Sequence, residues 1–474
     1  MKQKFIKSLF LASLVAVFFV ITSYVAENEA NALPPFARKY KTSCSMCHSI
    51  YPKLNAFGQA FKRNGYIWPG GAGEDNAARE QVKMADGLGK GTIDQGAPWG
   101  ALGEFEVKYS PDLAYRGASN NGGDPSFTLA APVVEIFTGG SSGGHGWLAI
   151  MIAKTDTQVM EAAQIQFNDI VGPDNILNIK VGALLGTAIA TDPKFMRGFL
   201  PTKSKVVNGG HNVQVIAQAV DVSGVAAGIE INGVIANMVY YGVGFLNGFG
   251  LGSADADNNE QKDLYGFLEF KVGGMKMIGD AVGTKWYEDN GATIRLFFAR
   301  MMQSTQANPV AATPTYDVTP NANVFGVTIN GGFSMLQFGV LFQYAMESNG
   351  QTEALILQED QIMSVAVNLG AILMDGKFNP GIRWEMVKYS GDAYDALTAA
   401  AVDDDQITEG ENWLHVGFSS LQSANIVHHV GVRLKLHTDW GKIGAGYTAG
   451  GNGPKGLTGG SMLDIVEYKL VWAF

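Results

Sequence analysis

The chain ends in VEYKLVWAF, residues 466–474, in which polar and apolar side chains largely alternate. Successive side chains of a β-strand point to opposite faces, so this stretch predicts a strand with one apolar, aromatic-rich face. The two faces carry Tyr468, Leu470, Trp472 and Phe474, and Glu467, Lys469, Val471 and Ala473, respectively. An ordinary edge strand is the less favoured interpretation, because sheet edges are usually blunted by charges rather than finished in bare aromatic residues.

The same alternation recurs elsewhere in the chain, for example in GEFEVKYS (103–110), GIRWEM (381–386) and HHVGVRLKLHTDW (428–440). A soluble β-sandwich would bury the apolar face, whereas a membrane barrel turns it to lipid and keeps the charged face in a wet lumen. Such segments, separated by Gly, Asn and Asp turns, number roughly 14 to 18, and membrane barrels favour even numbers. We therefore expect about 16 strands.

The N-terminus has the pattern of a secretory signal peptide. Three lysines precede the apolar run LFLASLVAVFFVI (9–21), and a small-residue site follows at Ala30-Asn31-Ala32. A membrane anchor is the alternative, but the run is short for a span of about 20 residues. Residues 1–32 are therefore expected to be removed on export.

Composition alone does not separate a sandwich from a membrane barrel. The chain has 60 glycines in 474 residues and only 16% charged residues, against about 25% in typical soluble domains. The aromatic C-terminus resembles the closing strand of bacterial outer-membrane proteins, and no later stretch supplies the roughly 18 apolar residues of a transmembrane helix. With the signal peptide, these features predict for residues 96–474 an all-β, transmembrane antiparallel β-barrel in outer-membrane lipid.

The only two cysteines of the chain lie in CSMCH, as Cys44 and Cys47, with His48 directly after them. This C-x-x-C-H spacing is typical of a covalent haem c, in which the thiols bind the vinyl groups and the histidine is the proximal iron ligand. One such haem is expected, because the tight spacing lets both sulfurs and one imidazole converge on one macrocycle.

Three other interpretations of CSMCH are less favoured. A redox-active dithiol normally starts a helix after a β-strand, but the preceding LPPFARKYKTS (33–43) is not strand-like. A structural zinc site needs further ligands, usually a second Cys/His pair, and no other cysteine exists. A plain disulfide would explain the cysteines but not the histidine.

The surroundings of CSMCH predict a small α-helical segment, with one short helix in YPKLNAFGQAFKRNGY (51–66). Aromatic side chains could wall a haem pocket or simply form a core: Phe36, Tyr40, Tyr51, Phe57, Phe61, Tyr66 and Trp68. A haem c domain is assigned to residues 33–95.

Charge is divided unevenly between this segment and the barrel. The chain is formally −10; because residues 1–32 contribute +1 and residues 33–68 contribute +6, the rest carries −17. The basic residues could pair with haem propionates or face solvent. Opposite charges attract, so the basic segment is expected to dock within or beneath the lumen of the acidic barrel.

Residues 34–66, followed by a barrel, resemble the fused monohaem cytochrome–porins of the bacterial outer membrane, whose best-known members oxidise ferrous iron. The resemblance implies that Cys44, Cys47 and His48 attach and ligate the haem. It also implies that extracellular Fe(II), or another redox donor, gives electrons that pass to a periplasmic carrier such as a soluble cytochrome c. No nucleic-acid partner is expected.

The sixth iron ligand is left open by the sequence. Met84 is the nearest downstream methionine and would give Met/His coordination, which raises the reduction potential. His429 and His437 lie on the predicted lumen face. Core packing for the methionine and lumen lining for the histidines are the competing interpretations.

The remaining motifs of the sequence do not define a second active site. Acidic stretches at 253–263 and 401–411 could gather divalent cations, or they could be solvated outer loops. No nucleophile–His–acid set can be assigned from spacing. The predicted function is electron transfer by an Fe(II)-oxidising oxidoreductase. The alternatives are an outward electron conduit and a plain porin whose haem segment is a structural plug.

Overall fold

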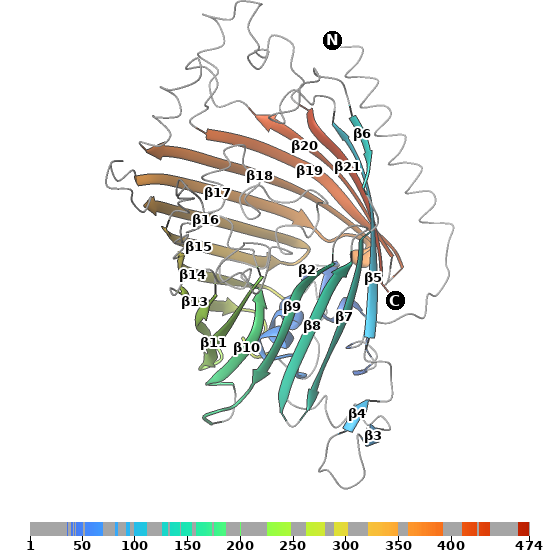
Figure 1. Cartoon of the computed structure of the whole chain (residues 1–474). Helices are drawn as coiled ribbons and strands as arrows, with labels where there is room; N and C mark the ends of the chain where they lie inside the picture. The colour runs from blue at the N-terminus through green and yellow to red at the C-terminus, as the bar shows by residue number, and fades with distance from the viewer. Residues whose placement is uncertain are drawn as a thin grey trace, which may run out of the picture.

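A computed structural model of residues 1–474 contains one closed antiparallel β-barrel (Figure 1). The structure describes most of 36–69, and 81–83, 92–94, 99–110, 126–185 with short gaps, 200, 225–247, 262–279, 289–301, 321–348, 359–391, 410–436 with a short gap, and 463–473. The expected signal peptide, residues 1–32, lies outside these described residues.

The barrel is built from seventeen described strands. They are β5 (Trp99–Ser110), β6 (Ser126–Leu129), β7 (Val133–Ser142), β8 (His145–Ala153), β9 (Gln158–Phe167), β10 (Asn178–Leu185), β11 (Val225–Ile235), β12 (Val239–Leu246), β13 (Asp263–Gly273), β14 (Gly291–Met301), β15 (Asn321–Phe333), β16 (Leu336–Ser348), β17 (Glu359–Ala371), β18 (Phe378–Gly391), β19 (Gly410–Ser423), β20 (Ile426–Leu436) and β21 (Leu463–Ala473). Because β6 and β7 pair with successive parts of β5, they share one position, and the barrel has 16. The predicted fold and strand number are confirmed.

The C-terminal strand closes the barrel. β21 pairs with β20 on one side and with β5, the first barrel strand, on the other, with Tyr468 opposite Val107 and Leu470 opposite Phe105. Every other neighbour pair is antiparallel as well. The strand whose aromatic face suggested a membrane barrel is therefore the one that removes its open edge.

The two ends of the barrel differ in the length of their connections. At one end, here called the turn end, two or three residues join β7 to β8, β11 to β12, β15 to β16 and β19 to β20. At the other, the loop end, long segments join β10 to β11 and β20 to β21. Outer-membrane barrels have short periplasmic turns and long extracellular loops, so the turn end faces the periplasm.

Alternation along the strands separates an apolar outer face from the lumen. On β13, Glu269 and Lys271 are buried, whereas Leu268, Phe270 and Val272 are exposed on the outside. On β21, Glu467, Lys469 and Val471 are buried and the aromatic face is outward, as predicted. Within the described ranges, no helix has the length and hydropathy that a transmembrane helix requires. The outward apolar side chains of the strands form the surface that lipid covers.

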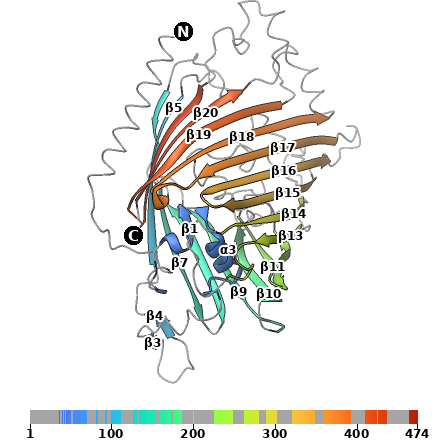
Figure 2. The ribbon, with the colours of Figure 1, turned by 180° about the vertical axis from the view of Figure 1, so that it is seen from behind.

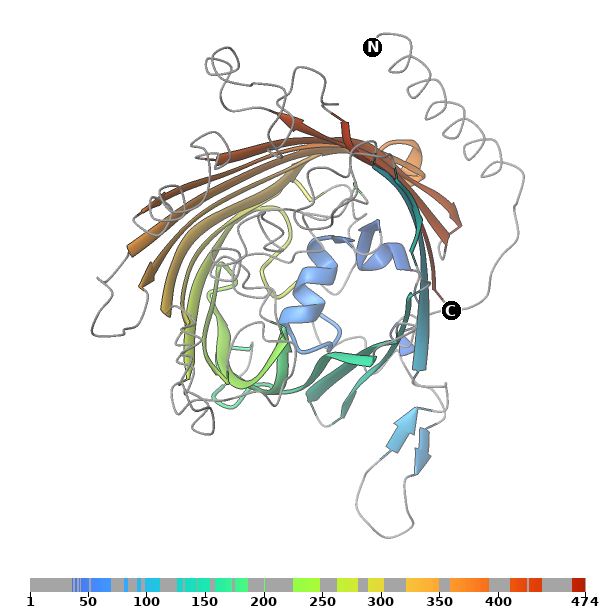
Figure 3. The ribbon, with the colours of Figure 1, turned by 45° about the horizontal axis from the view of Figure 1, so that its top comes forward.

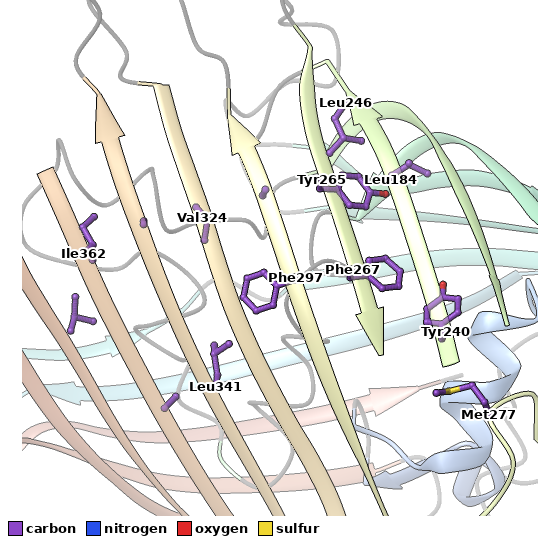
Figure 4. Close-up of a cluster of buried hydrophobic side chains, with 14 of the residues drawn as sticks. Leu184, Tyr240, Leu246, Tyr265, Phe267, Met277, Phe297, Val324, Leu341 and Ile362 are labelled. Atoms are coloured by element: carbon purple, nitrogen blue, oxygen red, sulfur yellow. The ribbon is translucent and has the colours of Figure 1, made fainter. Parts of the chain in front are cut away.

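The lumen wall is less polar than the sequence predicts. Charged side chains do face inward on β18 and β21, but much of the inward face from β12 to β17 is apolar (Figure 4). This buried cluster includes Leu246, Phe297, Val324, Leu341 and Ile362. These side chains are buried, so this part of the wall is packed rather than hydrated.

The long connection between β10 and β11 contributes one described side chain to the lumen. Its Leu200 is buried against β19, on the far side of the barrel from β10. A Cβ placed at Gly417 would lie 3.0 Å from Cδ2 of Leu200, so the leucine occupies the space a side chain would need there. Leu200 therefore lies in the lumen against the wall opposite β10.

The described residues of 36–69, here called the plug, also lie inside the barrel, at the turn end (Figures 2 and 3). The plug contains the 3-10 helix η1 (Cys44–Met46), the hairpin strands β1 (His48–Ile50) and β2 (Lys53–Leu54), and the helix α3 (Ala56–Arg63). Farther on, β3 (Gln81–Lys83) pairs with β4 (Thr92–Asp94), and the 3-10 helix η3 (Met374–Gly376) precedes β18.

The inside–outside assignment predicts a depth-dependent cost for charge on the outer face. Leu296 is outward near the middle of β14, and Val272 is outward at the turn end of β13. Leu296→Arg should cost about 2–4 kcal/mol of folding free energy in lipid vesicles, and Val272→Arg about 0–1 kcal/mol. Denaturant unfolding followed by tryptophan fluorescence measures both; equal costs would contradict the assignment.

Candidate functional site

The CSMCH stretch forms one tight turn of the plug. Cys44 begins η1, the Cys47 N–H donates to the Cys44 carbonyl at 3.2 Å, and His48 begins β1. Both cysteines are partly buried free thiols. The structure thus places the two thiols on one short turn, with the imidazole on the next residue.

Helix α3 packs directly onto this turn. Its N-cap residue Asn55 donates from its backbone to the Cys47 carbonyl at 2.9 Å and from Nδ2 to the Met46 carbonyl at 3.0 Å. The Asn55 side-chain oxygen accepts from the Gly58 N–H at 2.9 Å, which caps the helix. A Cβ at Gly58 would lie 2.1 Å from the Cys47 oxygen, so only glycine allows this contact.

An aromatic cluster surrounds the turn and the helix. Phe57 and Phe61 are buried together with Met275 from the β13–β14 connection, and Cys47 and Met46 pack against them. Phe36, Tyr40, Tyr66 and Trp68 complete the cluster, with ring centroids about 5–6 Å apart. All the aromatic residues predicted for this pocket therefore come together, except Tyr51, which lies outside the described residues.

Burial sets the chemistry of the thiols. Loss of hydration raises the pKa of Cys47 to about 12, with a further contribution from neighbouring Cys44, whose own pKa is raised by burial. A redox-active or nucleophilic cysteine needs the opposite shift, toward the thiolate. The environment is thus apolar and unsuited to a reactive dithiol. Burial also lowers the pKa of Lys53, on β2 of the adjoining hairpin, to about 7.

A buried ion pair anchors the end of α3 to the barrel wall. The Arg63 guanidinium pairs with Glu269 on β13 and also donates to the Met277 carbonyl at 3.3 Å. The other oxygen of Glu269 accepts from Arg295 on β14 at 2.6 Å. One carboxylate therefore links a cation of the plug to a cation of the wall, an instance of the attraction between basic plug and acidic barrel.

Further hydrogen bonds hold the plug to β7 and to β9 and the residue that follows it. Gln166 on β9 donates to the Arg63 carbonyl at 2.8 Å, and Asn168 donates to the Asn64 carbonyl at 3.1 Å. Near the start of the plug, Lys39 Nζ donates to Ser141 Oγ on β7 at 2.6 Å. The plug thus contacts several strands around the barrel rather than one edge.

The candidates for a sixth ligand have different outcomes. Met84 and His437 lie outside the described residues, so both stay predictions. His429 faces the lumen, as predicted, and its Nδ1 lies 2.6 Å from Ser419 Oγ. Most of the acidic stretches at 253–263 and 401–411 also lie outside the described residues.

Sequence reasoning missed two features of the lumen. The Glu269–Arg295 pair that receives Arg63 gave no local signal, because its members are about 200 residues from the plug. A second fully buried group joins Arg383 and Glu385 on β18 to His415 on β19. Its only signal was the alternation in GIRWEM, which placed Arg383 and Glu385 on one face.

The residues at the CSMCH turn fit a covalent haem. Cys44 and Cys47 provide the two sulfurs, His48 provides an imidazole, and the adjoining cluster is apolar and aromatic. That donor set and environment match the requirements for thioether attachment and proximal ligation. They do not match those of an exposed thiolate pair.

No protein-family model and no curated protein matches the chain. Solved barrels do: Pseudomonas putida OprB has a TM-score of 0.50 at 8% identity, over 79% of this chain and 94% of that one. For Vibrio cholerae OmpT the values are 0.47, 12%, 83% and 100%, and for an anion-selective porin from Comamonas acidovorans 0.47, 12%, 79% and 98%. The likeness shows the fold alone. With the apolar outer face, this is a porin-like transmembrane barrel of the outer-membrane type, in contact with lipid.

The Arg63–Glu269–Arg295 link predicts how firmly the plug is held. Glu269→Ala leaves two buried cations without their carboxylate, which costs about 3–5 kcal/mol, or about two to four orders of magnitude in the plug's opening equilibrium. Trypsin cleavage of the plug after Arg63, in detergent, should accelerate accordingly. The matched control is Glu385→Ala, which removes a buried carboxylate from the Arg383–Glu385 pair of the wall and should leave this cleavage unchanged. An equal effect of both variants would contradict the anchor.

The buried thiols predict slow alkylation of chain made without haem attachment. A pKa moved from 9.0 to about 12 lowers the thiolate fraction of Cys47 about a thousandfold between pH 7 and 9. Reactivity should rise only as the pH approaches the raised pKa. Iodoacetamide labelling of a Cys44→Ser variant, folded or in urea, measures this; equal rates at pH 8 would contradict the buried site.

Proposed function

We propose that this protein transfers electrons across the outer membrane through one covalent haem c on the plug, with extracellular Fe(II) as the donor and a periplasmic carrier as the acceptor. The carrying observation is the placement of Cys44, Cys47 and His48 on one turn, against an aromatic cluster, inside a membrane barrel. A haem held there would supply reversible one-electron chemistry.

The position of the plug supports this function. The apolar band of a membrane barrel is about 25 Å tall, so a redox group lying wholly beneath it would be remote from an extracellular donor. The plug lies within the wall at the turn end, where Arg63 binds Glu269 and Ile50 packs against Ile372 and Val427. A periplasmic carrier can approach that end, and an extracellular donor would act from the loop end.

The chain's own residues would do three things for such a group. Asn55 and Gly58 fix the backbone of the attachment turn against α3. The aromatic cluster excludes water around Cys47. Arg63, Gln166 and Asn168 hold the plug at one depth in the wall. A protein tunes the reduction potential of a redox centre through its position, the exclusion of water around it and nearby charge.

The second candidate is a plain porin with a structural plug, and the porin-like fold favours it. The plug and the inward-folded Leu200 both occupy the lumen, which argues against an open aqueous pathway. Solute flux into vesicles containing the haem-loaded protein separates the two functions. Rapid sugar flux with the plug in place would favour the porin.

The Fe(II) proposal predicts direct reduction of the purified protein. Protein from outer membranes of a host competent in c-type maturation is reoxidised and then mixed anaerobically with Fe(II), while its haem spectrum is recorded. Rapid reduction is expected, and it should be absent in Cys44→Ala/Cys47→Ala. Ser45→Ala, which keeps C-x-x-C-H, is the matched control and should behave as wild type.

Two outcomes of this experiment would contradict parts of the proposal. A normal c-type spectrum that ignores Fe(II) would reject iron as donor and leave the outward conduit, tested by adding an extracellular acceptor to reduced protein. Absence of covalent haem would reject the assignment of Cys44, Cys47 and His48.

A further inference from the structure

We propose that residues 273–279, here called the strap, hold the plug in the turn end of the barrel and keep the CSMCH turn covered. The strap leaves the wall at the end of β13 and lies on α3 of the plug. The inference goes beyond the proposed function, since it concerns how the plug is retained and applies with or without an attached haem.

The strap begins where β13 leaves the sheet. The connection from β13 to β14 is much longer than the turns of two or three residues at the same end of the barrel. Gly273 and Gly279, at the two ends of the strap, have positive φ angles of 71° and 84°, a conformation that glycine adopts at chain reversals. Between them, Met275 and Met277 are buried and Lys276 is exposed. The strap therefore has one side against the interior and one side away from it.

Side chains of the strap pack directly onto the plug. Met275 is buried against Phe57 and Phe61, in the cluster that also includes Cys47. Met277 is fully buried, and its side chain lies beside the helix of the plug (Figure 4). Displacement of the strap would therefore uncover the aromatic cluster around Cys47.

The contacts with the strap follow one face of α3. Phe57, Ala60, Phe61 and Asn64 have the i, i+3, i+4, i+7 spacing of a single helix face. A Cβ placed at Gly279 would lie 3.0 Å from Cβ of Ala60, so the backbone of the strap touches the helix there. The strap thus covers the helix along its length rather than at one point.

Backbone groups of the strap link the plug to the wall. Arg63 Nη1 donates to the Met277 carbonyl at 3.3 Å, and Asn64 Nδ2 donates to the Ile278 carbonyl at 3.0 Å. The Met277 N–H donates to the carbonyl of Asn237, in the turn between β11 and β12, at 3.1 Å. The same short segment therefore binds the end of α3 and a neighbouring turn of the barrel.

One carboxylate fixes the start of the strap. Asp289 Oδ1 accepts from the Met275 N–H at 2.5 Å, and Oδ2 pairs with Lys271 Nζ on β13 at 3.0 Å. A Cβ placed at Gly274 would lie 1.9 Å from Asp289 Oδ1, so a side chain there would displace the carboxylate. Asp289 therefore holds the strap in the position from which Met275 reaches the plug.

The competing interpretation is that the Arg63–Glu269 pair alone retains the plug and that the strap is only a long turn packed against it. The two interpretations differ in the effect of losing Asp289. If the strap retains the plug, release of its start should let α3 open more often. If the ion pair alone retains the plug, α3 should be unaffected.

Hydrogen exchange of α3, measured by mass spectrometry on the full-length protein in detergent, tests the strap. Asp289→Ala removes the acceptor of the strap, and Gly274→Ala places a Cβ against the same carboxylate. Each should accelerate exchange of the α3 amides about tenfold to a hundredfold, as expected for loss of one charge-assisted hydrogen bond. Asp289→Asn keeps an acceptor and should have a smaller effect.

Two matched controls should leave exchange of α3 as in the wild type. Lys276→Ala changes an exposed side chain of the strap itself, and Glu385→Ala removes a buried carboxylate elsewhere in the wall. Heat-dependent mobility on gels reports barrel formation in each variant. Unchanged exchange in both Asp289→Ala and Gly274→Ala, or equal acceleration in the controls, would overturn the inference.

The wild-type protein provides a second measurement if the strap variants do not fold. The Met275 and Met277 amides donate to Asp289 and Asn237, so a strap that retains the plug should be protected from exchange together with α3. Strap amides that exchange as fast as those of an unfolded chain, while α3 stays protected, would overturn the inference. Neither measurement needs a haem, so failure of the proposed function would not be mistaken for failure of the strap.

Discussion

Closure of the sheet is the constraint on which the rest of the molecule depends. Lipid offers no hydrogen-bond partner to an exposed strand edge, so a sheet can span a membrane only if its first and last strands pair. Here β21 meets β5 along the seam. Once closed, each strand has an outside and an inside, and the inside becomes a compartment that separates the plug from lipid and holds it at the turn end.

Much of the barrel could be predicted because its signal is local. Alternation with a period of two is visible in single segments, and it assigned the faces of β21 and the lumen position of His429 without knowledge of any partner strand. The exact strand positions could not be predicted, since β6 and β7 each look like a strand although they share one place beside β5. The apolar lumen wall was also hidden, because an inward face becomes apolar only where other chain segments fill the space.

The candidate site was also predictable only in part. Cys44, Cys47 and His48 are adjacent in the chain, so their chemistry could be inferred from spacing alone, whereas their support depends on residues far away. Net charge predicted an attraction between plug and barrel. It could not name the Arg63–Glu269 pair, whose members are 206 positions apart, since many acids of the barrel were equally possible partners. Long-range pairing is fixed by register and closure, which no local pattern contains.

The order of the elements along the chain has a consequence for assembly. The plug comes before every strand of the barrel, and β21, which shuts the seam, comes after all the others. If the seam shut around an empty lumen, Glu269 and Arg295 would lack their third member and Ile372 and Val427 would lack Ile50. Insertion of the plug before the last strand docks gives these wall residues their partners before the barrel closes. The plug would then be in place while the wall forms around it, and pairing of β21 with β5 would close the barrel last.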